Sequence, residues 1–332
     1  MKETVQEIAP GLYRISIPLA FGLDFVHTYA ALEQDRVALF DTGPSLPSSF
    51  SMYKSALARI GRSIEDVDRI FITHSHVDHC GFAGRIKEIS EARIFLSEVE
   101  FEAITRAHRD HRKIESIGNF WRQYGLDEKT IVAFSTVLDA FTSATAPFLT
   151  NHFLNDGALI KIGGRTFCAL FTPGHTRGHL SFYLPEEQIF LSGDCILPHI
   201  TPNLSPDPAC PTFLPLENFI GSLERIRALP VKTVYPAHGE PFEDLPGRVK
   251  EIIEHHIQRK DLTWRSVSNT PQLTSEISKR IFGDSLSGFD QGLAFNETYV
   301  HLLQLEKEGK IGRSQINGRI FFYQKEPRGA HH

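Results

Sequence analysis

The chain has 332 residues, a formal net charge of -5 and a pI near 6.3, with 41% hydrophobic and 23% charged residues. This composition can bury a sizeable core, and the length favours two domains. The acidic balance provides no bulk attraction to nucleic acid or to anionic membranes. No apolar stretch reaches the roughly 18 residues that predict a membrane span, and the scattered cysteines predict neither a disulfide framework nor a cysteine metal site.

The first residues, MKETVQEIAPGLYRI, lack the basic start and apolar core of a secretory signal. A reducing, cytoplasmic location without membrane contact is therefore expected. The oligomeric state is left open, with a homodimer as one alternative.

Several short strands are predicted in the first part of the chain. Runs rich in β-branched and aromatic residues indicate strands at 12–17 and 37–40, the second followed by a turn. Helical spacing of apolar residues predicts a helix over 50–60, and the next strand, 69–73, leads into His74. A cluster of histidines is thus expected at the carboxyl end of a strand.

Residues 98–146 have helical periodicity without strand alternation, which predicts a helical insertion, with a lid as one interpretation. Its aromatic side chains could form an apolar acyl pocket over a site, although packing in a core explains them equally well. They are Phe101, Phe120, Trp121, Tyr124, Phe134 and Phe141.

Three more predicted strands run into polar residues. The hairpin over 159–171 is followed by His175, the strand pair SFYLPEEQIFLSGD by Asp194, and the strand within 231–238 by His238. The proline-rich residues 199–216 predict an extended loop bordering the same place.

A charged helix is predicted over 246–259, after which short helices and a final hairpin with its turn at 317–318 are expected. These patterns predict two domains, residues 1–258 with the helical insertion and residues 259–328.

The sequence His74-Ser75-His76-Val77-Asp78-His79 is the central signal for function. Neutral imidazoles and a carboxylate within six residues after a strand can direct several ligands at one point. A lone surface histidine is usually only solvated or hydrogen-bonded, but the combination predicts a metal site.

HSHVDH matches the H-x-H-x-D-H signature of the metallo-β-lactamase superfamily, and TPGHTRGH, LSGD and PAHG resemble its later motifs in the same order. The resemblance spans roughly residues 8–245 and implies an α+β fold, an αββα sandwich with ligands at one edge of two sheets. It also implies two divalent cations, the first held by His74, His76 and His175, the second by Asp78, His79 and His238, and both by a bridging Asp194.

By the same resemblance, a hydroxide bridging the two ions attacks a carbonyl, with Asp78 and Asp194 as catalytic residues and Asp78 also relaying a proton. Zinc is the expected metal, with iron or manganese as alternatives. Asp41 resembles a carboxylate that orients a ligand histidine, or it caps a turn. His179 is either a further outer contact or a core residue, and Cys80 and Cys195 are expected to be buried filler.

Residues 261–326 resemble a winged helix, an extension that several hydrolases of the family carry. A DNA-reading helix needs groups such as Arg, Lys, Asn or Gln, yet residues 296–308 hold Glu297, Glu306 and Glu308 against Lys307. This charge favours packing, so a DNA-binding regulator is the weakest of the alternatives.

Taken together, the motifs most resemble the hydroxyacylglutathione hydrolase branch. They predict a dinuclear hydrolase of a thioester or ester-like bond in a small acyl substrate. The alternatives are a phosphodiesterase or endoribonuclease, a mononuclear iron sulfur dioxygenase, and a lactonase. The lactonase is disfavoured because Cys195-Ile196-Leu197-Pro198 stands where many lactonases place a tyrosine.

Overall fold

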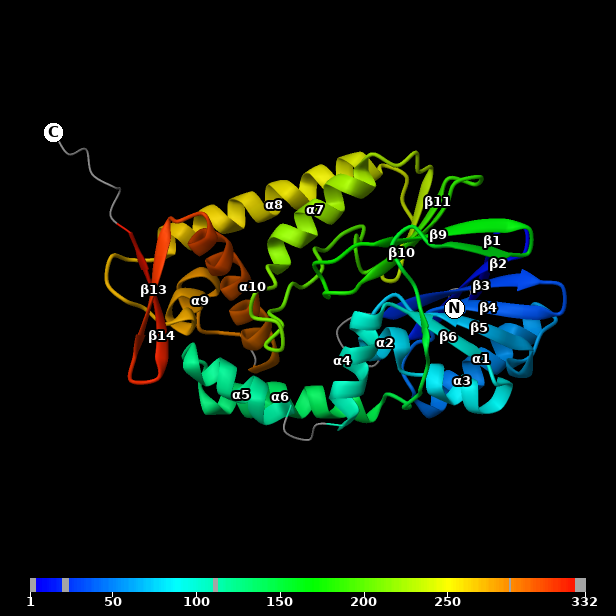
Figure 1. Ribbon diagram of the computed structural model, residues 1–332, viewed down its shortest axis with the longest axis horizontal. Coiled ribbons are helices and arrows are strands. Elements are labelled where there is room, and N and C mark those ends of the chain that lie inside the picture. The colour runs from blue at the N-terminus through cyan, green and yellow to red at the C-terminus, as the bar shows by residue number, and fades with distance from the viewer. Residues whose placement is uncertain (1–3, 20–23, 110–112, 287, 326–332) are drawn as a thin grey trace.

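The structure is a computed structural model that describes residues 4–19, 24–109, 113–286 and 288–325. Two stacked sheets form one side of the molecule, and a group of helices with a small hairpin forms the other (Figure 1). The larger sheet has seven strands in chain order, antiparallel from β1 to β4 and parallel from β4 to β7. These strands are β1 (Val5–Ala9), β2 (Leu12–Pro18), β3 (Phe25–Glu33), β4 (Arg36–Phe40), β5 (Val67–Phe71), β6 (Arg93–Leu96) and β7 (His152–Phe153).

The smaller sheet has five strands in the order β12-β11-β10-β9-β8. Only its β11–β12 pair is parallel, because the chain crosses over through a helix between these two strands. The strands are β8 (Leu159–Ile162), β9 (Arg165–Phe171), β10 (Leu180–Leu184), β11 (Ile189–Gly193) and β12 (Thr233–Pro236).

Three apolar cores hold these layers together. In β4, Val37 and Leu39 contribute to the core beneath the outer helices, whereas Ala38 and Phe40 face the core between the sheets. The period of two along a strand thus buries both faces of the larger sheet. Its outer face is covered by α1 (Pro47–Arg59) and α3 (Ala83–Ser90), and the outer face of the smaller sheet by α7 (Pro215–Arg227) and α8 (Leu245–Ser266). The predicted αββα sandwich is confirmed.

A fourth core joins the helices of the predicted insertion to the end of the chain. Trp121 and Phe134 pack there with Phe295, Tyr299 and Phe322. The elements around this core are α5 (Lys113–Gln123) and α6 (Glu128–Ser143), which follow α4 (Glu98–Arg109), and then α9 (Thr274–Phe282), α10 (Gly288–Lys307), β13 (Ile311–Ile316) and β14 (Arg319–Gln324). Core packing therefore accounts for the aromatic residues Trp121, Tyr124 and Phe134 of the insertion.

Some predicted bounds differ from the structure. The helix expected at 246–259 continues to Ser266, so the predicted domain boundary lies inside α8. The loop predicted to end at 216 ends earlier, because Pro215 occupies the first turn of α7, where its missing N–H is not needed. One of the helices expected to be short, α10, has 20 residues. Residues 326–328 of the predicted second domain lie outside the described residues, and the division into domains stays a prediction.

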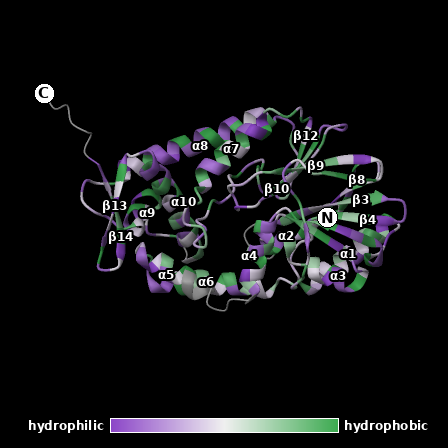
Figure 2. Ribbon diagram, in the orientation of Figure 1, coloured by the Kyte–Doolittle hydropathy of each residue, from purple (hydrophilic) through white to green (hydrophobic). Residues whose placement is uncertain are grey.

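Hydrophobic residues concentrate in the stacked strands, whereas α8 displays many hydrophilic residues along its length (Figure 2). Among the described helices, none combines the length and apolar character needed to cross a bilayer.

Candidate metal centre

All seven predicted ligands lie where strands end at one edge of the sandwich. His74 and His76 follow β5, and the short helix α2 (Val77–Cys80) carries Asp78 and His79. The remaining three ligands, His175, Asp194 and His238, follow β9, β11 and β12. Because strands of the two sheets end at this edge, ligands distant in sequence meet at one point.

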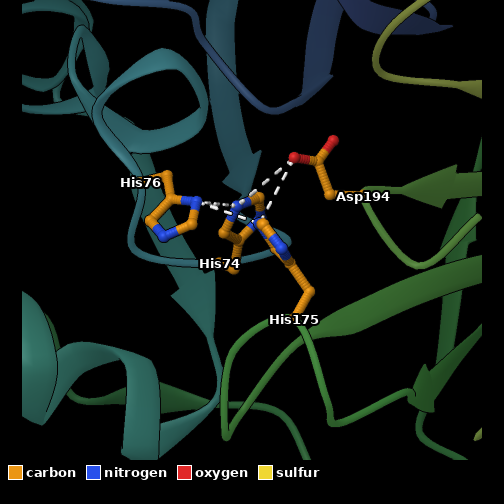
Figure 3. Close-up of side chains that lie close together, drawn as sticks. All are labelled: His74, His76, His175 and Asp194. Carbon is orange, nitrogen blue, oxygen red and sulfur yellow. Dashed lines mark hydrogen bonds and ion pairs between the residues drawn. The ribbon is translucent and has the colours of Figure 1, made fainter. Parts of the chain in front are cut away.

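The first group consists of His74, His76, His175 and Asp194, whose candidate ligand atoms lie within 4.8 Å of one another. His76 Nδ1 lies 2.9 Å from His74 Nε2 and 3.0 Å from His175 Nε2. Asp194 Oδ2 lies 3.3 Å from His175 Nε2 and 4.0 Å from His74 Nε2, and Figure 3 shows the three rings and the carboxylate converging. Three ring nitrogens and a carboxylate oxygen are a suitable donor set for a divalent cation.

The second group consists of Asp78, His79 and His238. Asp78 Oδ2 lies 3.3 Å from His238 Nε2 and 3.7 Å from His79 Nε2. The other oxygen of Asp194, Oδ1, lies 3.5 Å from His238 Nε2 and 3.6 Å from His79 Nε2. One carboxylate thus faces both groups, with a different oxygen toward each.

Outer hydrogen bonds orient four of the five rings. His79 Nδ1 lies 2.8 Å from Asp41 Oδ2, so the contact expected between Asp41 and a ligand histidine is present. His74 Nδ1 bonds to Thr73 Oγ1 at 3.0 Å. His175 and His238 use Nδ1 to bond backbone carbonyl oxygens of Asn203 at 2.8 Å and Phe25 at 2.9 Å, respectively. Each of these bonds leaves Nε2 directed into the cluster, the usual arrangement for ligating imidazoles.

The interior of the cluster has the character of a cation site. His79 Nε2 and Asp194 Oδ1 are buried and have no hydrogen-bond partner among the described residues. Burial lowers the pKa of His79, but the carboxylates around it, with Asp194 foremost, raise that pKa well above its ordinary value. The carboxylates thus favour a positive charge inside the cluster, and His79 Nε2 and Asp194 Oδ1 are available as ligand atoms. Both features fit divalent cations at these residues.

The ligands differ in solvent access. His74 and His79 are fully buried, whereas His76 is exposed and Asp78 is partly exposed. The cluster is therefore open to solvent on the side of His76 and Asp78.

The neighbouring residues singled out in the sequence lie close to the ligands. His179 is buried, bonds to Thr172 Oγ1 through Nδ1 at 2.8 Å, and accepts the Asp194 backbone N–H on Nε2 at 3.1 Å. It thus fixes the backbone of Asp194, whose carboxylate faces both groups. Cys80 and Cys195 are fully buried, as expected for packing residues. His175 and His238 are oriented by the backbone carbonyls of Asn203 and Phe25. Because every residue has a backbone carbonyl, these partners could not be predicted from the sequence.

Comparison with known proteins identifies the family of the chain. The family model described as "Metallo-beta-lactamase superfamily" matches residues 21–238. The chain is 27% identical to the beta-lactamase-like protein 2 homolog of Caenorhabditis elegans over 313 residues, 93% of this chain and 88% of that protein. It is 22% identical to the "probable metallo-hydrolase YqjP" of Bacillus subtilis over 311 residues, 93% of this chain and 96% of that protein.

Among solved structures, a metallo-beta-lactamase family protein of Thermus thermophilus is similar with a TM-score of 0.84 and 29% identity, covering 96% of this chain and all of that one. A beta-lactamase domain protein from Burkholderia ambifaria has the same TM-score at 24% identity, covering 97% and 94% of the two chains, and supports the fold alone. The chain belongs to the metallo-beta-lactamase superfamily, and its cluster of His and Asp side chains is suited to metal ions.

Proposed function

We propose that this protein is a dinuclear metal-dependent hydrolase of a thioester or ester-like bond in a small acyl substrate. The observation that carries the proposal is Asp194, whose Oδ2 faces His74 and His175 while its Oδ1 faces His79 and His238. A carboxylate shared in this way is what two adjacent cations require. Zinc is the metal that we propose, and iron and manganese suit the same set of nitrogen and oxygen donors.

Bound at these residues, two divalent cations supply Lewis acidity and make a strong nucleophile available at neutral pH. The protein's own part is to hold the donor atoms in place and to manage protons. Asp78 is suited to the second task, since its carboxylate is partly exposed and its Oδ2 lies 3.3 Å from His238 Nε2. We assign to Asp78 a proton relay in addition to its role as a ligand: the carboxylate oxygen that does not act as ligand would take the proton lost by the attacking water and pass it to the leaving group.

The charges around the centre favour an acyl substrate over a polyanion. Arg177 lies in the TPGHTRGH segment, but its guanidinium is 3.3 Å from Asp207 and 3.8 Å from Glu102. Arg106 lies 4.0 Å from the same Asp207. Since both arginines face carboxylates, little positive charge is left to hold a nucleic-acid backbone, which needs several phosphate contacts.

The test is metal analysis combined with a substrate panel of thioesters, lactones, phosphodiesters and RNA. We expect about two ions per chain and the fastest turnover on a thioester, with His76→Ala lowering metal content and activity together. Preferred cleavage of RNA or phosphodiesters would establish the nuclease alternative. Oxygen consumption with a persulfide and a single bound iron would instead establish a sulfur dioxygenase, and failure to bind zinc, manganese or iron would refute the metal centre.

For residues 259–328 we propose a structural, winged-helix-like unit rather than a DNA reader. Its long helix α10 is buried on several sides, and Glu297 on it pairs with Arg259 of α8 at 2.9 Å. Two basic residues at the hairpin are paired with carboxylates, Arg313 with Glu306 and Lys310 with Glu308. A mobility-shift assay at moderate salt should show no specific retention of DNA.

We also propose a cytoplasmic location for the protein.

A further inference from the structure

Glu100 is a buried carboxylate that no ligand motif contains. It lies in the first turn of α4, and the residue is 1% exposed. Its Oε2 accepts the backbone N–H of Ser75 at 2.8 Å, and its Oε1 accepts the backbone N–H of Gly178 at 2.7 Å. Ser75 stands between His74 and His76, and Gly178 follows His175 in the TPGHTRGH loop. One side chain therefore joins the two loops that carry the three histidines of the first group.

The surroundings of Glu100 fix this arrangement further. Ser97 Oγ donates to the Gly178 carbonyl oxygen at 2.7 Å and accepts the Glu100 backbone N–H at 3.2 Å. A Cβ atom at Gly178 would lie 2.4 Å from Ser97 Oγ and 3.0 Å from Glu100 Oε1. The loop can approach the start of α4 so closely only because residue 178 has no side chain.

Electrostatics give Glu100 a second role. Burying a carboxylate is costly unless hydrogen bonds and nearby positive charge compensate it. Two divalent cations would bring four positive charges, and the ligand carboxylates of Asp78 and Asp194 and the outer carboxylate of Asp41 offset part of them. Glu100 adds a further negative charge on the side of the first group, where the ligands apart from the shared Asp194 are histidines.

We infer that Glu100 is a positioning residue of the metal centre: its carboxylate clamps the loops of His74, His76 and His175 and offsets the charge of the cation they hold. This inference rests on the proposed function only in requiring that the cluster binds metal. The identity of the hydrolysed bond does not enter it.

The test compares full-length wild-type protein with Glu100→Gln, which keeps the shape of the side chain but removes its charge and places an amide N–H against a backbone N–H. Zinc affinity is measured by competition with a chromophoric chelator, and the cobalt-substituted protein is examined by visible absorption. We expect zinc to bind about 10–100-fold more weakly, as is typical when an outer partner of metal ligands is lost. The cobalt bands should also change, because the ligand geometry of the first group changes.

Glu297→Gln is the control, since it neutralises another glutamate, a half-buried one that pairs with Arg259 away from the ligand loops. It should leave zinc affinity and the cobalt spectrum as in wild type, even if thermal unfolding shows a loss of stability. If Glu100→Gln also lowers only stability and leaves both metal readouts unchanged, the inference is wrong and Glu100 is simply a structural residue.

Should Glu100→Gln fail to fold, Glu100→Asp provides a second form of the test. It retains the charge, but its shorter side chain cannot keep the backbone N–H groups of both Ser75 and Gly178 at hydrogen-bond distance. Weaker zinc affinity is expected, and unchanged affinity would overturn the inference. A wild-type protein that binds no metal would refute the proposed function itself, so the two failures are distinguishable.

Discussion

The buried histidine pair between α8 and α10 should make the stability of the fold depend on pH. His256 and His301 are 4% and 0% exposed. His301 Nδ1 donates to the Glu297 carbonyl at 2.7 Å, so its Nε2 is left to accept from His256 Nδ1 at 3.3 Å. His256 Nε2 is then buried without a hydrogen-bond partner among the described residues. Both rings are therefore neutral in the folded protein.

A proton on either ring would place a charge inside this interface. Burial, followed by the neighbouring ring, lowers the pKa of His256 to about 3, and burial lowers that of His301 to about 4. Glu297 on α10 attracts a proton and Arg259 on α8 opposes one, but burial outweighs both. Since the folded pKa values are depressed, the unfolded chain binds more protons below its own pKa of about 6.5. Stability is thus complete above that pH and falls as the pH drops toward 4.

The magnitude follows from linkage. Between pH 7 and pH 5, each histidine that titrates only in the unfolded chain lowers the free energy of unfolding by about 2 kcal/mol. His256→Gln removes one such group and keeps an amide donor for His301. Urea unfolding at the two pH values should therefore show a pH-dependent loss about 2 kcal/mol smaller in the variant than in wild type, with equal m-values.

The candidate metal centre is the same in wild type and in His256→Gln. Its contribution to the pH dependence of the unfolding free energy therefore cancels when the two proteins are compared. His255→Gln, one residue earlier and with a side chain 39% exposed, is the matched control and should follow wild type. Parallel pH dependence of wild type and His256→Gln would refute the reasoning.

Three further predictions test other parts of the structure. Asp41→Asn weakens the partner of His79 Nδ1 and should reduce zinc affinity about 10–100-fold by chelator competition. Gly193→Ala should lower the free energy of unfolding by about 1–3 kcal/mol in urea, because φ is +52° and a Cβ would lie 2.8 Å from His179 Nε2. Gly157→Ala is the control, since φ is +78° but no atom of the described residues lies within 4 Å of its Cβ, and it should lower the free energy of unfolding less. Cys210 should be alkylated by iodoacetamide before Cys80, as mapped by mass spectrometry, because a Thr212 hydrogen bond lowers the pKa of Cys210 whereas burial raises that of Cys80. Equal rates at the two thiols would contradict this assignment.

The candidate ligands were predictable because each follows a strand with a clear local pattern. The strand before His74 reads as β structure, and the stretches before His175 and Asp194 do the same. Once the motifs are placed at strand ends, their meeting at one edge follows from the layered fold. The resemblance also predicted a contact between Asp41 and a ligand histidine, but not that this histidine is His79.

What the sequence could not predict are contacts that depend on the packing of distant segments. Glu100 looks like any acidic residue in the first turn of a helix, where carboxylates are common because the helix dipole stabilises negative charge. Nothing local indicates that its two oxygens reach Ser75 and Gly178. The lengths of α8 and α10 were likewise underestimated, because their stability comes from tertiary burial rather than from local propensity.

The clearest such contact connects the end of the chain to the metal centre. Trp121 Nε1 donates to Asn296 Oδ1 at 3.3 Å, and Asn296 Nδ2 donates to Ser205 Oγ at 3.3 Å. Ser205 Oγ also accepts from Asn203 Nδ2 at 2.9 Å, and the Asn203 carbonyl receives His175 Nδ1 at 2.8 Å. Helices α5 and α10 thus support, through one loop, the backbone that orients a candidate ligand. Because this loop follows Asp194 and its Asn203 carbonyl binds His175, helices α5 and α10 contribute to the geometry of the candidate centre as well as to the fourth core.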